Sequence, residues 1–138
     1  MTAKDYLKRY ERIGERLRQA KKELDYIEAQ IESMGGLGDG MPRGTNVSDR
    51  TGNLAALIAE SKKTYEHVLA ESLRIRRNIE ATVNAVEDPL QSRLLYERYI
   101  ECKPWRVIAG DMIMDEVYVR GRLHGRALES VRKITGME

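Results

Sequence analysis

The chain has 138 residues, too few for a large multidomain enzyme and enough for one or two small units. Hydrophobic residues make up 41% and charged residues 33%, with only 6% aromatic residues, a balance typical of helix-rich proteins rather than of β-sandwiches. The formal net charge is only +2, so charge is informative through its distribution along the chain.

The sequence carries no sign of secretion or of a membrane anchor. It has a single cysteine, Cys102, which excludes an internal disulfide framework and a cysteine-based zinc cluster and favours a reducing compartment. The N-terminal residues are polar and charged from Lys4 onward, and no apolar run is long enough to cross a bilayer. We therefore expect a soluble, cytoplasmic protein without a membrane partner.

Residues 3–34 carry apolar side chains at alternating steps of three and four, which is the heptad seam of a coiled coil. Charged residues of both signs lie between them, as on a solvated helix face. The pattern predicts a long helix whose seam packs against another helix; one amphipathic helix in a globule is the alternative. The seam consists of Tyr6, Tyr10, Ile13, Leu17, Ala20, Leu24, Ile27, Ile31 and Met34.

A stretch rich in glycine interrupts the helical pattern. Glycines and Pro42 remove helix propensity up to Gly44, and polar residues continue the interruption to Asp49. We interpret residues 35–52 as a flexible connector. No Gly-Lys-Ser/Thr sequence follows and no strand is expected before it, so the glycines do not indicate a nucleotide-binding loop.

Residues 54–86 predict a second long helix with the same spacing, capped by residues 49–53. The connector would let the two helices fold into an antiparallel hairpin. Because a bare hairpin buries little surface, we expect it to pack on a second copy and form a homo-oligomer. The second seam consists of Leu54, Ile58, Ser61, Tyr65, Val68, Ser72, Ile75, Ile79, Thr82 and Val86. The side chains assigned to oligomerisation are Tyr10, Ile13, Leu17, Leu24, Ile27, Ile31, Ile58, Tyr65, Ile75 and Ile79.

The chain changes character at Asp88-Pro89, where aspartate supplies a cap and proline favours a helix start. Residues 101–103 break this short helix, Pro104 opens a second one, and Asp115 caps a third. Three short helices with a tight turn before the last describe a helix-turn-helix. The sequence thus predicts an all-α fold, with a long antiparallel coiled-coil hairpin (residues 1–87) followed by a three-helix module (residues 88–138). The buried side of the third helix is expected to carry Val119, Leu123, Ala127, Leu128, Val131 and Ile134.

The predicted third helix concentrates positive charge. Between Val119 and Ile134, five basic residues face one acidic residue, Glu129. A recognition helix needs an apolar face that holds it on its scaffold and arginines that bind phosphates or guanine edges. Gly121 and Gly125 are costly inside a helix, and tolerable where a phosphate or a neighbouring helix approaches the backbone. A basic, merely solvated helix is the alternative.

Three segments of this module resemble region 4 of sigma-70-type factors. They are residues 94–100 (Leu-Leu-Tyr-Glu-Arg-Tyr-Ile), 105–109 (Trp-Arg-Val-Ile-Ala) and 123–128 (Leu-His-Gly-Arg-Ala-Leu). The order of coiled helix, glycine-rich gap, second helix and this ending is similar to RinA/ArpU-like late-gene activators of Gram-positive prophages. Two positions depart from the pattern: Ile113 stands where many such motifs have glycine, and the spacing from Val119 to Ala127 is one residue longer than in sigma factors.

The resemblance implies sequence-specific binding to double-stranded DNA and control of phage late genes, with RNA polymerase as a further partner in the cytoplasm of the host bacterium. Because of the longer spacing, which side chains of the third helix point into the groove stays open. The candidates for DNA contact are Arg106, Glu116, Val117, Tyr118, Arg120, Gly121, Arg122, His124, Arg126 and Lys133.

The other side chains that could take part in catalysis or bind a metal do not form a recognisable site in the sequence. His67 and His124 stand alone, so neither predicts a metal site, and His124 is either a polar tip at the edge of the module or a phosphate contact. Trp105 is expected to close the small core rather than to stack on a base. Carboxylates are spread over helix surfaces, so we expect no enzyme, no cofactor and no metal.

Two other functions stay open. A DNA-packaging adaptor of the small-terminase kind also joins a helix-turn-helix to a coiled assembly domain, and it would form a ring of many subunits. A helical interaction protein would use the basic end to bind RNA polymerase or a host factor, and it would bind no duplex.

Overall fold

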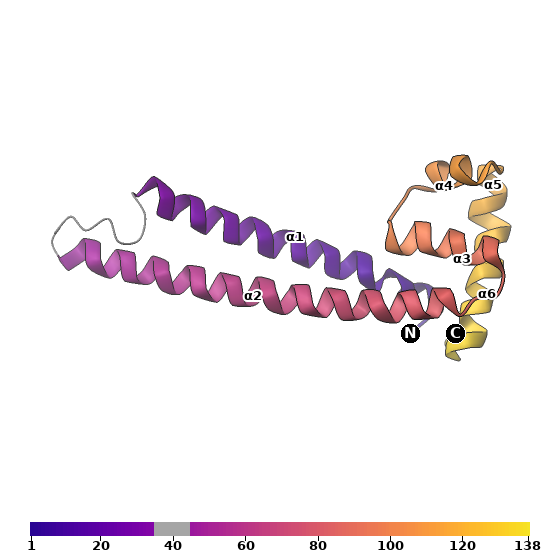
Figure 1. The fold of residues 1–138 in the computed structure, drawn as a ribbon, viewed down its shortest axis with the longest axis horizontal. Helices are drawn as coiled ribbons and strands as arrows, with labels where there is room; N and C mark the ends of the chain where they lie inside the picture. Colours follow the sequence, from indigo (N-terminus) through magenta and orange to yellow (C-terminus); the bar gives the residue numbers. More distant parts are fainter. Residues whose placement is uncertain (35–44) are drawn as a thin grey trace. The chain divides into compact units, whose positions relative to one another are not determined.

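The structure is a computed structural model that describes residues 1–34 and 45–138, the side chains of residues 45–51 excepted. Within these ranges the regular structure is entirely helical, so the predicted all-α class is confirmed. The elements in chain order are α1 (Ala3–Ser33), α2 (Thr45–Asn84), α3 (Pro89–Leu95), η1 (Tyr96–Ile100), α4 (Trp105–Met112), α5 (Glu116–Tyr118), η2 (Val119–Leu123) and α6 (His124–Thr135) (Figure 1).

Two of these helices contain a wider π-type turn. The turn η1 continues α3, and the turn η2 joins α5 to α6 without a break, because the residues at both junctions keep right-handed helical angles. We call residues 116–135 the C-terminal helix.

The start of α2 corrects the predicted connector. The helix begins at Thr45, so residues 45–52 are helical, and the caps expected at residues 49–53 lie inside α2. Extending an existing helix costs less than nucleating one, which lets polar residues of ordinary propensity lengthen α2 toward its N-terminus. Residues 35–44 of the predicted connector lie outside the described residues.

The chain divides into two compact units, and the boundary expected between residues 87 and 88 does not separate them. The first unit contains Met1–Ile13 and Ser72–Glu138, and the second contains Gly14–Glu71. Ala3 and Leu7 at the start of α1, with Ile79 and Val83 near the end of α2, are completely buried. The ends of the two long helices therefore belong to the same core as the C-terminal helices, and the predicted division was wrong.

Polar contacts tie the first unit together across long stretches of sequence. The backbone N–H of Ala3 donates to the carbonyl of Glu138 at 2.8 Å. The Tyr6 hydroxyl lies 3.0 Å from Oγ1 of Thr82 and donates to the Asn78 carbonyl at 3.1 Å. The Tyr6 contacts hold the first turns of α1 against the last turns of α2, and the Ala3 contact ties α1 to the C-terminal residue.

In the second unit, Leu24, Ile31 and Val68 from the predicted seams are buried, and Nζ of Lys21 lies 5.6 Å from the ring centroid of Tyr65. In the first unit, Tyr6 contacts Thr82 and Tyr10 contacts Arg76, so these parts of α1 and α2 run antiparallel.

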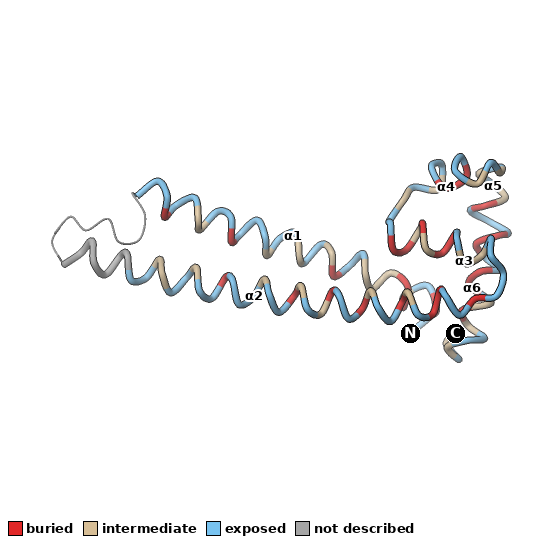
Figure 2. Tube along the Cα trace, in the orientation of Figure 1, coloured by how far each residue is buried: buried red, intermediate tan, exposed pale blue. Residues whose placement is uncertain are grey.

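The side chains assigned to oligomerisation are largely covered within the single chain (Figure 2). Five of them are buried, namely Ile13, Leu24, Ile31, Ile75 and Ile79. The other five, Tyr10, Leu17, Ile27, Ile58 and Tyr65, are half-buried. These side chains thus pack α1 against α2 within the chain, and homo-oligomerisation stays a prediction. Among the described residues of the two helices, the large hydrophobic side chains that are most exposed are Tyr26, Leu57 and Leu73.

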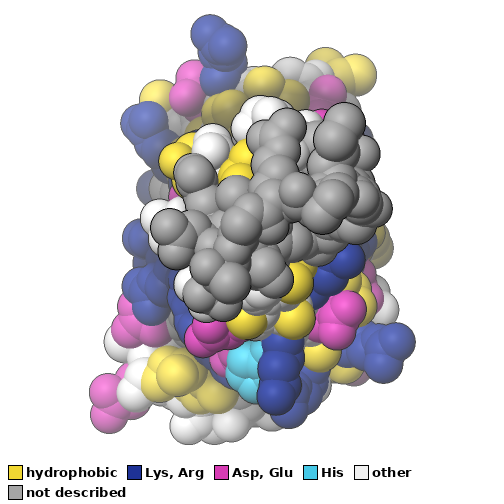
Figure 3. Space-filling view, turned by 90° about the vertical axis from the view of Figure 1, so that its left-hand side faces the viewer, with side chains coloured by type: hydrophobic (Ala, Val, Ile, Leu, Met, Phe, Trp, Pro, Cys, Tyr) yellow, Lys and Arg dark blue, Asp and Glu magenta, His cyan; other side chains and the backbone are white. Residues whose placement is uncertain are grey.

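The face of the molecule shown in Figure 3 carries basic and acidic side chains interspersed with hydrophobic ones, so charges of both signs share it. Within the described ranges, no helix is both long enough and apolar enough to span a membrane.

Candidate nucleic-acid interface

The last fifty residues form a small helical core that presents the C-terminal helix. Oδ1 of Asp88 accepts the backbone N–H groups of Leu90 at 2.9 Å and Gln91 at 3.1 Å, which confirms the predicted cap before Pro89. The core of this module contains Leu94, Leu95, Tyr99, Ile100, Ile108, Ala109, Val119, Leu123, Ala127, Leu128 and Val131. The sequence predicted the buried side of the C-terminal helix correctly, apart from Ile134, which lies in the last turn and is 43% exposed.

The turn before the C-terminal helix is strained. Ile113 adopts the left-handed conformation, with φ 54° and ψ 51°, and its side chain is 92% exposed. The backbone N–H of Met114 donates to the Ala109 carbonyl at 3.0 Å, which closes the end of α4. Glycine is the usual residue for this conformation, and a β-branched residue there is an outlier. Ile113 thus stands where the backbone adopts the conformation that glycine favours.

Asp115 starts the C-terminal helix as predicted. Its Oδ2 accepts the backbone N–H of Tyr118 at 3.2 Å. Further along the helix, the N–H of His124 donates to the carbonyl of Val119, five residues back, and this bond defines the π-type turn η2. Such a turn accommodates one more residue than a regular helical turn, and it lies between Val119 and Ala127.

His124 is a core residue, and its assignment to DNA contact was wrong. The side chain is buried, and its Nε2 lies 2.6 Å from the Tyr99 hydroxyl. The ring of Trp105 meets the imidazole edge-on at 4.6 Å, and the guanidinium of Arg98 lies over Trp105 at 4.5 Å. Burial and the charges of Lys4 and Arg98 lower the pKa of His124 to about 4, so the ring is neutral near pH 7 and its Nε2 accepts a hydrogen bond from the Tyr99 hydroxyl.

The other basic candidates on the C-terminal helix are exposed to solvent. Arg120, Arg122, Arg126 and Lys133 are exposed, and none of them forms an ion pair with a described residue. The acidic residue of this helix is engaged elsewhere, because Oε2 of Glu129 pairs with Arg132 at 3.0 Å. The positive charge of the C-terminal helix is therefore available to an anionic partner.

The other candidates differ in exposure. Val117 is 67% exposed and Arg106, in the first turn of α4, is also exposed. Glu116 and Tyr118 are half-buried. A Cβ added at Gly121 or at Gly125 would meet no atom of the chain within 4 Å, so packing of a neighbouring helix within the chain does not explain these glycines.

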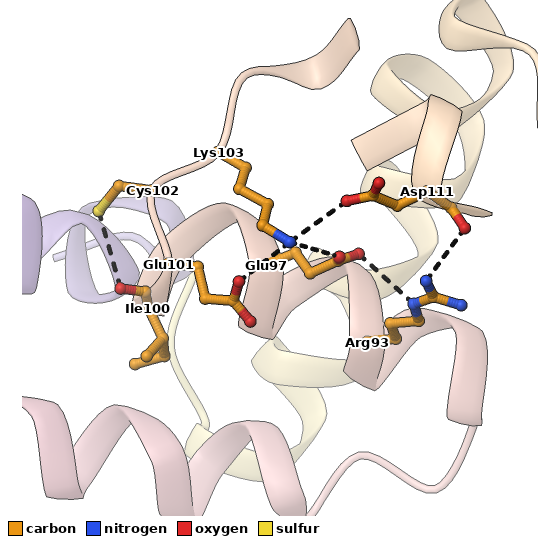
Figure 4. Close-up of polar contacts among 7 residues, drawn as sticks. All are labelled: Arg93, Glu97, Ile100, Glu101, Cys102, Lys103 and Asp111. Carbon is orange, nitrogen blue, oxygen red and sulfur yellow. Dashed lines mark hydrogen bonds and ion pairs between the residues drawn. The ribbon is translucent and has the colours of Figure 1, made fainter. Parts of the chain in front are cut away.

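An ion-pair network that the sequence did not predict fixes the loop between η1 and α4 (Figure 4). Nζ of Lys103 lies 3.0 Å from carboxylate oxygens of Glu97 and Glu101 and 3.2 Å from Asp111. Arg93 joins from the other side, with Nε 3.5 Å from Oε2 of Glu97, which is buried. The three acidic partners raise the pKa of Lys103. Because each carboxylate is engaged by a cation, the network joins helices and is not an open catalytic site.

Signals for this network were weak in the sequence, since Lys103 meets partners six and eight residues away across a loop rather than at helical spacing. Cys102 lies in the same loop with φ 56°, and its Sγ is 3.9 Å from the carbonyl oxygen of Ile100. Within the part of the chain that the structure describes, no three histidine, cysteine or acidic residues gather in a way that could hold a metal ion.

Comparison of the chain with protein-family models, with curated proteins and with solved structures finds no match.

Proposed function

We propose that this chain is a sequence-specific transcription regulator that binds double-stranded DNA through its C-terminal helix. The observation that carries the proposal is the two-sided character of that helix. Its inner face is held in the core by Val119 and Ala127, both completely buried, while its outer face carries exposed arginines without partners among the described residues. Arginine forks match phosphate oxygens and the acceptor pair of guanine.

The turn supports the same proposal. A residue such as Ile113, held in a left-handed conformation, stores strain, and such strain concentrates at sites of function. The resemblance to sigma region 4 and to RinA/ArpU-like activators supplies the biological setting, which is control of phage late genes together with RNA polymerase in the host cytoplasm.

The first experiment is selection of bound sequences from random duplex DNA. An enriched motif is expected, and its symmetry would report how many modules bind together. Titrations of the wild type, Arg120→Ala and Arg126→Ala against selected and scrambled duplexes at several salt concentrations then separate two kinds of contact. Arg74→Ala is the matched control, because Arg74 is an exposed arginine on α2.

We expect Arg126→Ala to weaken binding to every duplex and to reduce the slope of log K against log salt by about one, as for the loss of one phosphate contact. Arg120, nearer the start of the helix, is expected to affect preference for the selected sequence more than non-specific affinity. Arg74→Ala should leave both unchanged. Absence of enrichment together with unchanged binding in both C-terminal variants would overturn the proposal in favour of a protein-interaction role.

The number of subunits in the oligomer distinguishes a transcription regulator from a DNA-packaging adaptor. Light scattering of the full chain is expected to give a small homo-oligomer. A ring of many subunits would favour the small-terminase kind of adaptor, which also binds DNA.

A further inference from the structure

Val117 is an exposed hydrophobic side chain whose position the fold does not explain. It is 67% exposed, whereas Val119 two residues later is completely buried. Positions two residues apart on a helix are separated by a rotation of about 200° about its axis, so Val117 points away from the core into which Val119 packs. Valine is also a weaker helix former than many residues that an exposed position would accept. The side chain thus contributes little to folding.

The neighbours of Val117 on the helix surface give this position its chemistry. Residues three and four positions later are Arg120 and Gly121. Arg120 is exposed, and the backbone at Gly121 is open because an added Cβ would meet nothing within 4 Å. Position 117 is therefore next to an exposed arginine position and a stretch of uncovered backbone on the helix surface.

This mixture matches one kind of macromolecular surface. In the major groove of DNA, the 5-methyl group of thymine lies among the acceptor atoms of neighbouring guanines. An apolar protein surface would bury the charge of Arg120 without a partner, at a large cost. Double-stranded RNA fits less well, since uracil lacks the methyl group and the major groove of A-form RNA is too narrow for a helix.

We infer that Val117 contacts the 5-methyl group of a thymine in the DNA site, next to the base that Arg120 contacts. This inference rests on the proposed function and names a specificity determinant within it. The two residues are separated by about 4.5 Å along the helix axis, compared with 3.4 Å between successive base pairs. The selected sequence should accordingly contain a thymine within one or two base pairs of a guanine.

The test removes the methyl group from the DNA and its partner from the protein. Each thymine of the selected duplex is replaced in turn by deoxyuridine, which differs only by that methyl group. At one position, the wild type should lose about fourfold in affinity, the value of burying one methyl group. Val117→Ala should bind the thymine and uracil duplexes equally, because the partner of the methyl group is gone. Melting curves confirm that the variant folds, which is expected for an exposed side chain.

Two controls keep the result specific. Val117→Thr retains the branched shape and one methyl group, so it should keep part of the thymine preference. Arg74→Ala should show the same preference as the wild type. The inference is overturned if no deoxyuridine substitution weakens the wild type, or if one weakens Val117→Ala as much as the wild type. If either outcome occurs while the selected duplex is still bound specifically, the proposed function remains and only the inference about Val117 is overturned. Failure to select any duplex would overturn both the proposed function and this inference.

Discussion

Replacing Ile113 by glycine should stabilise the protein, although it removes a large hydrophobic side chain. The left-handed conformation, at φ 54° and ψ 51°, costs a residue with a Cβ roughly 1–2 kcal/mol. Glycine escapes this cost but loses about 0.5–1 kcal/mol through the greater freedom of its unfolded chain. The side chain is 92% exposed, so little burial is lost. The net gain is about 0.5–1 kcal/mol, which corresponds to about 2–4 °C in melting temperature for a chain of this size.

Thermal and urea unfolding followed by circular dichroism measure this gain. Ile113→Ala is the control, because alanine keeps the Cβ and the strain, and it should stay within about 0.5 kcal/mol of the wild type. Gly136 offers the reverse experiment: it ends α6 at φ 72°, so Gly136→Ala should destabilise by about 1 kcal/mol. If Ile113→Gly lowered the melting temperature, or if glycine and alanine at this position behaved alike, the assignment of strain to the turn would be refuted.

Three further outcomes are expected. Between about pH 6.5 and 4 the free energy of unfolding should fall by up to about 3 kcal/mol through His124, because its folded pKa of about 4 is below its unfolded value and the unfolded chain binds the proton first. Urea unfolding at several pH values checks this, and an equal slope in His124→Gln would contradict it. Gly121→Ala should raise the free energy of unfolding by about 0.5–1 kcal/mol, since the added Cβ meets no atom of the chain, and it should weaken DNA binding. Gly110→Ala is the control, because its added Cβ also meets no atom of the chain. If Gly121→Ala raised both the stability and the DNA affinity, close approach of DNA at Gly121 would be excluded. Deleting residues 1–13 should abolish cooperative unfolding of the C-terminal helices, because Ala3 and Leu7 belong to their core, and an unchanged melting curve would contradict the division into units.

Local chemistry predicted those parts of the fold that depend on neighbouring residues. Asp88 and Asp115 both cap helices, because a carboxylate placed before a helix accepts N–H groups from its first turn. The buried face of the C-terminal helix followed from its apolar spacing as far as Val131. These features need no information from distant parts of the chain.

The boundary between the units could not be predicted in this way. The apolar seam of α2 continues through Ser72 into the first unit without any change of spacing. Nothing in the periodicity shows that the core around the seam changes at that point. The burial of Ala3 and Leu7 was not predicted for the same reason. The first turn of α1 lies beside the last residue of the chain, and the spacing of apolar residues does not indicate that contact.

Among the candidate site residues, His124 shows where reasoning from residue type fails. A histidine between arginines suggests contact with phosphate, yet η2 turns it toward Tyr99 and Trp105 in the core. Arg122 and Arg126 on either side of it are exposed, whereas His124 itself is buried. Burial, not residue type, therefore separates the residues available to a ligand from those that hold the helix.

The wider turn η2 affects which side chains of the C-terminal helix face outward. Val119, Leu123 and Ala127 follow one another at steps of four, and in a regular helix each such step would rotate the position by about 40° away from the core. The wider turn η2 removes part of that rotation, so all three stay buried, and Val117, Gly121 and Gly125 keep the opposite side.

Deleting Arg122 would leave steps of three and four, which a regular helix accommodates. The variant should therefore fold with a stability near that of the wild type by urea unfolding, and its DNA preference should change, because the residues beyond the deletion turn relative to Val117. Loss of folding would show that η2 has a structural role of its own rather than merely accommodating the extra residue.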